Sequence, residues 1–266
     1  MRVLTWNLWW RFGDWAERRK AIRTVLAQTE PDVCGLQEVW ADPAENLAGW
    51  LADELGMHWA WGPTRHPERW QRRVDDPAAQ FGTAILSRWP IADPRVEELP
   101  GDEGRVVLGA MIEAPHGRVP FFSAHLSAMA GRSAIRRTQV ERLCRLVAER
   151  PAPDHPPVLV GDFNAPPESD EVRLVGGDLT APVVPGLVLL DAWLFAGPGD
   201  PGYTWDRRNP HVAEGPDPSA RIDYIRVGVR YDLTAGRVRS VRLAGDGPVD
   251  GVWPSDHAAV VAELSG

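Results

Sequence analysis

Several apolar runs in this sequence end in polar side chains whose chemistry is complementary. The polar residues at these ends are Asn7, Glu38, the pair Asp162 and Asn164, and the pair Asp256 and His257. A strand that ends in carboxylate, amide or imidazole groups places them at a sheet rim, where water, metal and substrate can reach them. Hard oxygen ligands with imidazole, and without thiolate, suit Mg²⁺ or Mn²⁺ and phosphate-ester chemistry. The pattern therefore predicts a metal-dependent phosphoesterase.

Glu38 is the expected direct ligand of Mg²⁺, with Mn²⁺ as a substitute. Mg²⁺ typically takes only one or two carboxylates and keeps its waters, which leaves room for a phosphate oxygen. Asn7 ends another apolar run, where an amide is costly to bury without a partner. It is expected to orient Glu38 or to complete the metal site through its oxygen. Taken alone, each residue could equally be a solvated strand end or a turn former.

Asp162 and Asn164 lie two positions apart after an apolar run, so a continuing strand would project both to one side. A carboxylate beside an amide can position an attacking water and hydrogen-bond a phosphorane-like transition state. The alternative for this Asp-x-Asn sequence is a plain Asx turn.

His257 needs a second group to fix its tautomer and raise its basicity, and a carboxylate is the usual choice. Adjacent strand residues point to opposite faces, so Asp256 is a poor partner and is instead expected to contact the metal or an amide. Asp223 is the candidate partner. His125 ends another run and is either structural or a donor to a nonbridging phosphate oxygen.

Composition is that of an ordinary globular protein, with 266 residues, 44% hydrophobic and 25% charged. The net charge of −8 provides no global basic footprint for nucleic acid, although a local groove with cations can offset it.

Cys34 and Cys144 are expected to be small core residues in a reducing compartment. The most apolar stretch, 181–197, is interrupted by prolines and an aspartate, and no signal peptide is visible. We expect a cytoplasmic protein without a membrane span or an evident protein partner.

Strands and helices alternate along the chain without a separating linker. Strands are expected at 2–8, 33–39, 82–87, 105–114, 119–126, 157–162, 222–229, 238–243 and 258–262, and helices at 14–28, 42–55 and 133–149. The polar clusters are scattered from residue 7 to residue 257, so one continuous domain, 1–266, must gather them. Many strands with few helices predict an α/β fold in which packed sheets are covered by helices.

These residues, in this order, resemble the endonuclease/exonuclease/phosphatase superfamily, which includes pancreatic deoxyribonuclease, AP endonucleases, neutral sphingomyelinases and inositol-polyphosphate 5-phosphatases. The resemblance covers nearly the whole chain. The matching stretches are Thr5–Leu8, Leu36–Val39, Gly82–Arg88, His125-Leu126, Gly161–Asn164, Arg221–Ile225 and Ser255–His257.

The resemblance implies a four-layer α/β sandwich, with two packed mixed sheets flanked by helices and the site at one rim. By position, Glu38 resembles the main metal ligand, with Asn7 assisting and Asp256 near the metal. The remaining matches are Asp162 and Asn164 as the pair that orients water and contacts the transition state, His257 with Asp223 as the His–Asp dyad, and His125 as the phosphate-contacting histidine. Either Asp162 or His257 could be the general base.

Substrate specificity is expected to reside in the segment from Trp59 to Arg73, where aromatic residues alternate with arginines. Such side chains could stack bases and hold phosphates, could meet anionic lipid head groups, or could simply be a solvated surface. The candidate substrate-binding residues are Arg69, Trp70 and, beyond His125, Arg136. The sequence favours a nuclease acting on DNA. The alternatives are a hydrolase of a small phosphate ester (a lipid head group, an inositol phosphate or a nucleotide) and a non-catalytic binding protein on the same fold.

Overall fold

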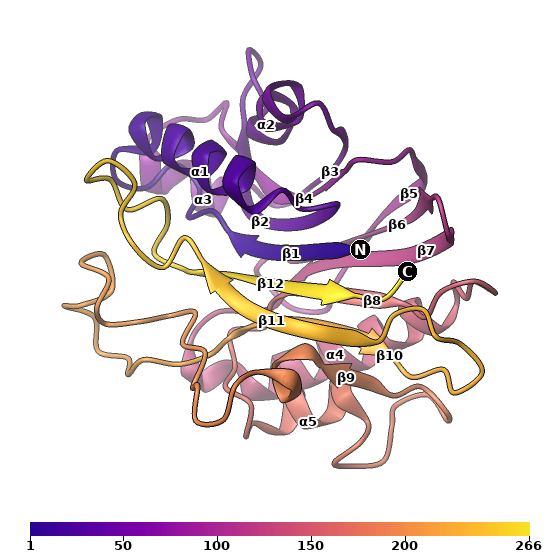
Figure 1. Cartoon of the computed structure of the whole chain (residues 1–266). Coiled ribbons are helices and arrows are strands. Elements are labelled where there is room, and N and C mark those ends of the chain that lie inside the picture. Colours follow the sequence, from indigo (N-terminus) through magenta and orange to yellow (C-terminus); the bar gives the residue numbers. More distant parts are fainter.

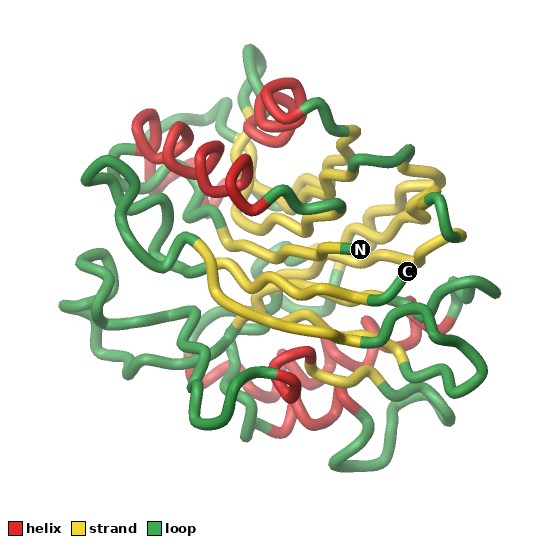
Figure 2. The backbone as a smooth tube through the Cα atoms, viewed as in Figure 1, coloured by secondary structure: helices red, strands yellow, loops and turns green.

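The computed structural model describes residues 1–266 as two six-stranded sheets packed face to face (Figures 1 and 2). The first sheet has the order β11-β12-β1-β2-β4-β3 and comprises β1 (Arg2–Asn7), β2 (Val33–Ala41), β3 (His58–Pro63), β4 (Gln80–Ser87), β11 (Val238–Ala244) and β12 (Ala259–Leu264). The second has the order β5-β6-β7-β8-β10-β9 and comprises β5 (Ile91–Glu98), β6 (Val106–Ala114), β7 (Gly117–His125), β8 (Val158–Asp162), β9 (Leu189–Asp191) and β10 (Asp223–Gly228). Both sheets are mixed, because β1–β2 and β7–β8 are parallel pairs and the others are antiparallel.

Helices cover the outer face of each sheet, which completes four layers (Figure 1). The helices beside the first sheet are α1 (Trp15–Thr29), α2 (Leu47–Leu55) and α3 (Glu68–Val74). Those beside the second are α4 (Ser133–Ala148) and α5 (Asp170–Gly176), and two short 3₁₀ helices are η1 (Ala130–Arg132) and η2 (Ala192–Phe195). The expected four-layer α/β sandwich is confirmed. No helix has the length and apolar character needed to cross a membrane.

Strand β1 is apolar on both faces because both faces are buried. Leu4 and Trp6 pack into the cluster beneath α1 and α2, whereas Val3 belongs to the cluster between the two sheets. Because a central strand of such a sandwich is buried on both sides, it is an almost continuous apolar run. Thr5 is a buried polar residue within this strand and accepts a hydrogen bond from Gln37, whereas Asn7 ends the strand at the rim of the sheet.

Element boundaries differ from expectation where local hydrogen bonds compete with helix. The helix expected from Asp42 begins at Leu47, because β2 continues to Ala41 and the Asp42 carboxylate accepts the backbone N–H groups of Ala44 and Glu45 in a turn. Asn46 caps the helix instead. The sequence reading did not predict β3, α3, β5, α5 or β9. Most are edge strands or seven-residue helices, whose short or partly exposed patterns carry little periodic signal.

Candidate active site

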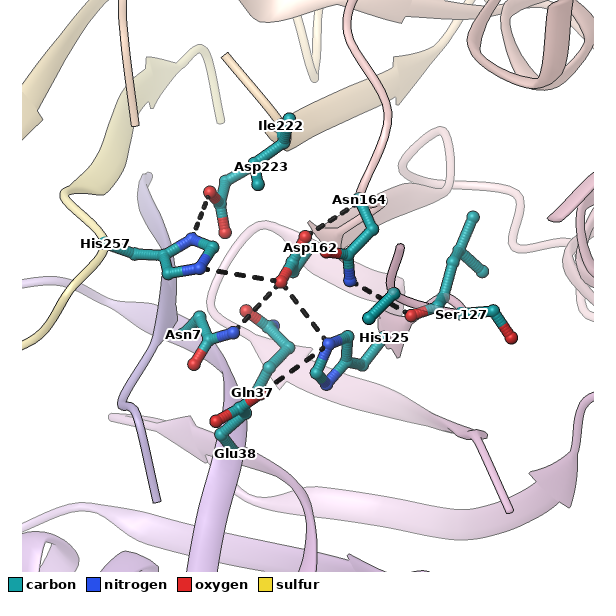
Figure 3. Close-up of polar contacts among 12 residues, drawn as sticks. Asn7, Gln37, Glu38, His125, Ser127, Asp162, Asn164, Ile222, Asp223 and His257 are labelled. Carbon is teal, nitrogen blue, oxygen red and sulfur yellow. Dashed lines mark hydrogen bonds and ion pairs between the residues drawn. The ribbon is translucent and has the colours of Figure 1, made fainter. Parts of the chain in front are cut away.

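Three strand ends and two strand starts meet at one rim of the sandwich. Asn7 ends β1, His125 ends β7 and Asp162 ends β8, while Asp223 begins β10. The strand register sets His125 and Asp223 on either side of Asp162. His257 precedes β12, which runs antiparallel to β1 and so returns the chain to the same rim. Figure 3 shows these side chains pointing toward one another.

Asp162 lies at the centre of the cluster and is almost completely buried. Its Oδ1 accepts the backbone N–H of Asn164 at 2.8 Å, and its Oδ2 accepts Asn7 Nδ2 at 3.0 Å (Figure 3). His125 Nε2 lies 3.3 Å from the same Oδ2. Burial by itself would raise the pKa of Asp162, but the hydrogen bonds from His125 and Asn7 and the charge of His257 outweigh it and hold the pKa well below its usual range. Asp162 is therefore ionised at neutral pH.

The segment Asp162–Asn164 forms the Asx turn that was the alternative expectation, and the expectation of a continuing strand was wrong. Asn164 adopts a left-handed φ of 50° and its N–H returns to the Asp162 carboxylate, which is an Asx turn. Strand β8 ends at Asp162, so Asn164 reaches the site through this turn and not through a continuing strand. Its side-chain amide donates to the carbonyl of Leu126 at 3.1 Å.

The expected pairing of His257 with Asp223 is present, with Nδ1 and Oδ2 2.8 Å apart. Burial alone would lower the pKa of His257, but the charges of Asp223 and Asp256 raise it well above 6.5. The imidazole therefore carries protons on both nitrogens, and Nε2 lies 3.9 Å from Asp162 Oδ2. Trp205 packs edge-on against the ring at 5.1 Å, and the indole of Trp6 holds the backbone carbonyl of His257.

Arg105 is a site residue that the sequence did not reveal. Its Nη1 lies 2.8 Å from His125 Nδ1 and 2.9 Å from Nε2, and its Nε donates to the buried Glu103 at 3.0 Å. Burial and this guanidinium lower the pKa of His125 to about 4. His125 is therefore neutral, and the network assigns Nδ1 as acceptor from Arg105 and Nε2–H as donor to Asp162. A single arginine at the start of an apolar strand carries no local signal of this contact.

Glu38 and Asp256 form the carboxylate part of a candidate metal site. Glu38 has a left-handed φ of 51° at a register irregularity between Leu36 and Val39, and such a bulge re-aims a strand side chain. Burial raises the pKa of Glu38, and burial together with the Glu38 charge raises that of Asp256 to about 7. Two desolvated carboxylates that disfavour each other's charge, facing one cleft, are a donor set that a divalent cation would stabilise. These hard oxygen donors therefore fit Mg²⁺.

Asp162, Asp223 and His257 also place one potential ligand atom each within 4.8 Å of the others. The His257 Nδ1 and Asp223 Oδ2 atoms are already bound to each other, and Asp162 already has three protein donors against its two oxygens. We therefore assign these three residues to a hydrogen-bonded proton network and favour Glu38 and Asp256 as the metal ligands.

A cleft of about 570 Å³ opens over the cluster. The residues that line it are Asn7, Trp9, Phe12, Glu38, Trp70, Arg73, Arg105, His125, Ala128, Asp162, Asn164, Trp205, Asp256 and His257. All of the expected catalytic and metal-binding residues are in this set except Asp223, which lies behind His257. Trp9, Phe12 and Trp205 are aromatic lining residues that only the tertiary structure identifies.

The three expected substrate-binding residues lie in different surroundings. Trp70 lines the cleft but is only 4% exposed and stacks on Phe81 at 4.1 Å. Arg69 is not among the residues that line the cleft, and its Nη1 lies 3.5 Å from Glu103. Arg136 is 3% exposed and its Nε binds Glu171 at 2.6 Å, so the structure places it in the interior and not on the cleft.

The fold and this site define a phosphoesterase-type sandwich, and comparison with known proteins identifies its family. The model of the endonuclease/exonuclease/phosphatase family matches residues 4–257, and the chain belongs to that family. Its members are phosphoester hydrolases, and they use divalent metal ions.

A curated relative is inositol phosphosphingolipids phospholipase C of Schizosaccharomyces pombe (strain 972 / ATCC 24843), 27% identical over 220 residues that cover 74% of this chain and 47% of that protein. The chain thus spans about half the length of this relative.

Solved structures of the same fold include D. rerio TDP2 complexed with single strand DNA product, with a TM-score of 0.79, 21% identity and coverage of 100% and 99% of the two chains. The human Nocturnin catalytic domain with bound sulfate has a TM-score of 0.72, 23% identity and coverage of 100% and 93%. At these identities the likeness establishes the fold.

Proposed function

We propose that this protein is a divalent-metal-dependent hydrolase that cleaves phosphodiester bonds by in-line attack of water, with DNA as its substrate. The observation that carries the proposal is the setting of Asp162. It is an ionised carboxylate at a cleft, held by the Asn164 N–H, the Asn7 amide and His125. A carboxylate fixed by three donors can hold a water in one orientation.

Glu38 and Asp256, with the side-chain oxygen of Asn7, would hold Mg²⁺, or Mn²⁺ in its place. When bound, the metal would neutralise charge on the nonbridging phosphate oxygens and stabilise the leaving oxygen. The raised pKa values of both carboxylates support this role, because each is unfavourable as an anion without a nearby cation.

The protonation states of Asp162 and His257 indicate their roles in the reaction. Asp162 is ionised and is the acceptor for the attacking water. His257, protonated and held by Asp223, directs positive charge toward the phosphorane-like oxygens. Asn164 can donate its second amide hydrogen to the same oxygens, whereas the single N–H of neutral His125 is used to hold Asp162.

Two features of the cleft support DNA as the substrate. Trp9 and Trp205 offer aromatic surface that can stack unpaired bases, and Arg73, which lines the same cleft, can hold a phosphate. The fold is also that of a protein solved with a single strand DNA product. We further propose that residues 1–266 act as one catalytic domain in the cytoplasm, in agreement with the buried free thiols of Cys34 and Cys144.

A lipid head-group phosphodiester is the second candidate substrate. The chain is 27% identical to a protein named as a phospholipase C for inositol phosphosphingolipids. The net charge of −8 also favours a small ester over a long polyanion.

Nicking of supercoiled plasmid in Mg²⁺ and then Mn²⁺ tests the proposal, with His257→Ala as the inactive variant. His116→Ala is the matched control, because His116 is exposed in the turn between β6 and β7, at the opposite end of β7 from His125 and the cleft. Nicking by the wild type and by His116→Ala, but not by His257→Ala, is expected. If no DNA is cut while inositol phosphosphingolipid vesicles lose their head groups, the second candidate replaces the first.

A further inference from the structure

Arg18, on α1, is an unusual buried cation beneath the cleft. The residue is 2% exposed, and all five of its N–H donors are used. The acceptors are the backbone carbonyls of Leu8, Trp9, Trp10, Phe12 and Pro254, at 2.9 to 3.0 Å. None of them is a carboxylate.

Such an arrangement is costly, because a buried charge is normally paired with an opposite charge. Burial lowers the pKa of Arg18 to about 10, so the guanidinium is still charged at neutral pH. Its hydrogen bonds connect two segments that are far apart in sequence. One is the loop 8–12, which follows Asn7, and the other is Pro254, two residues before Asp256.

The loop 8–12 has a conformation that its own sequence disfavours. Trp9 and Trp10 both lie in the left-handed region, with φ of 56° and 38°. Bulky residues adopt it only where the surroundings enforce it. Arg18 stabilises this conformation because its Nη2 donates hydrogen bonds to the carbonyls of both residues. Its guanidinium also lies 4.7 Å from the centre of the Trp9 ring. His211 packs against the same ring at 4.4 Å.

This conformation sets the direction of the Asn7 amide. The Trp9 N–H donates to Asn7 Oδ1 at 2.9 Å, which turns Nδ2 toward Asp162 Oδ2 at 3.0 Å. The Trp10 N–H donates to the Glu38 carbonyl at 3.0 Å, and Ser255 Oγ donates to the Asn7 carbonyl at 2.7 Å. Both segments that Arg18 holds therefore donate a hydrogen bond to Asn7, one from the Trp9 N–H and the other from Ser255 Oγ.

We infer that Arg18 is a positioning residue that acts through Asn7. It holds Trp9 and Trp10 in the left-handed conformation, and the Trp9 N–H then fixes the Asn7 amide against Asp162. The kinetic part of this inference rests on the proposed function, whereas the structural part does not.

Hydrogen exchange tests the structural part without any substrate. In the wild type, the backbone amide hydrogens of Trp9 and Trp10 are expected to exchange as slowly as that of Trp6 in β1. Fast exchange of the Trp9 and Trp10 amides would overturn the inference, and this test does not depend on any variant folding. Arg18→Lys keeps the charge but has three donors in place of five. It is expected to speed exchange in 8–12 while β1 stays protected. Arg226→Lys is the matched control, a change at another buried arginine, 4% exposed and off the cleft, and is expected to leave 8–12 protected.

Kinetics test the coupling. Arg18→Lys is expected to lower kcat about 10- to 100-fold, the range for groups that orient a site residue, with KM changed less than about threefold. In an Asn7→Ala background the same change is expected to cost less than about threefold in kcat, because the amide that Arg18 orients is gone. If the kcat losses of Arg18→Lys and Asn7→Ala multiply in the double variant, action through Asn7 is refuted. A similar kcat loss from Arg226→Lys would refute it too. A wild type that cleaves no phosphodiester refutes the proposed function, and the exchange result still decides the role of Arg18.

Discussion

Asp223→Asn tests the contribution of the dyad most directly. The change preserves side-chain volume but removes the negative charge that His257 Nδ1–H faces at 2.8 Å. A hydrogen bond between charged groups contributes ~1.5–3 kcal/mol. Each ~1.4 kcal/mol is a factor of ten in rate. If the bond acts in the transition state, kcat should fall roughly 10- to 150-fold while KM changes little.

The same substitution should have little effect on folding. Asp223 is fully buried and its Oδ1 has no hydrogen-bond partner, so the folded protein already bears the cost of desolvating this carboxylate. His257, unlike an arginine, can also lose its proton when the charge of Asp223 is removed, so no buried charge is left without a partner. The melting temperature is therefore expected to stay within about 4 °C of the wild type.

Asp191→Asn is the matched control for this experiment. Asp191 is another buried aspartate, but it accepts Arg221 Nη1 at 2.7 Å and lies on β9, outside the set that lines the cleft. Breaking this ion pair should lower the melting temperature by roughly 5 °C or more and leave kcat unchanged. Initial rates on a phosphodiester and thermal unfolding of both variants decide the question. A kcat for Asp223→Asn within about twofold of the wild type would refute the assignment of the dyad.

Three further outcomes are expected. Glu38→Gln should raise the Mg²⁺ concentration for half-maximal hydrolysis at least about tenfold, and an unchanged metal titration would remove Glu38 as a ligand. Arg105→Leu should raise the pKa of His125 above about 4, because a nearby cation that opposes its protonation is lost; NMR titration of His125 measures this. Glu171→Gln should cost about 3 kcal/mol of unfolding free energy at pH 7, because it leaves Arg136 buried without its partner. The Arg136 guanidinium holds the pKa of Glu171 below its usual 4.5. The difference in unfolding free energy between the variant and the wild type should therefore persist above pH 4.5 and shrink as the pH falls through the folded pKa. Urea unfolding from about pH 7 to 4 in which this difference grew as the pH fell would contradict the reasoning.

The candidate site was predictable where one local pattern contained both a strand and its polar end. Asn7, Asp162 and Asp223 each lie at the tip of a strand whose buried face is apparent from its sequence. Glu38 could be named from the same pattern, but its direction could not, because it depends on a bulge against β4.

Arginines were the least predictable residues. Arg18, Arg105 and Arg136 look alike as sequence, yet the first binds five carbonyls, the second a histidine and the third a glutamate. A guanidinium at the end of a long side chain can reach many partners, and only the assembled fold selects one. The Arg136–Glu171 pair, for example, joins α4 to α5, a short helix that the sequence did not predict.

By itself, the sequence determined the packed α/β sheets and the residues at their rim, because apolar periodicity and the polar residues that interrupt it are local properties. Tertiary structure alone decided which of those residues touch. His125, Asp162 and Asp223 become neighbours through the register of β7, β8 and β10 (Figure 3). The protonation states of His125, Asp162 and His257 also depend on burial and on charges contributed by distant segments, which no local pattern contains.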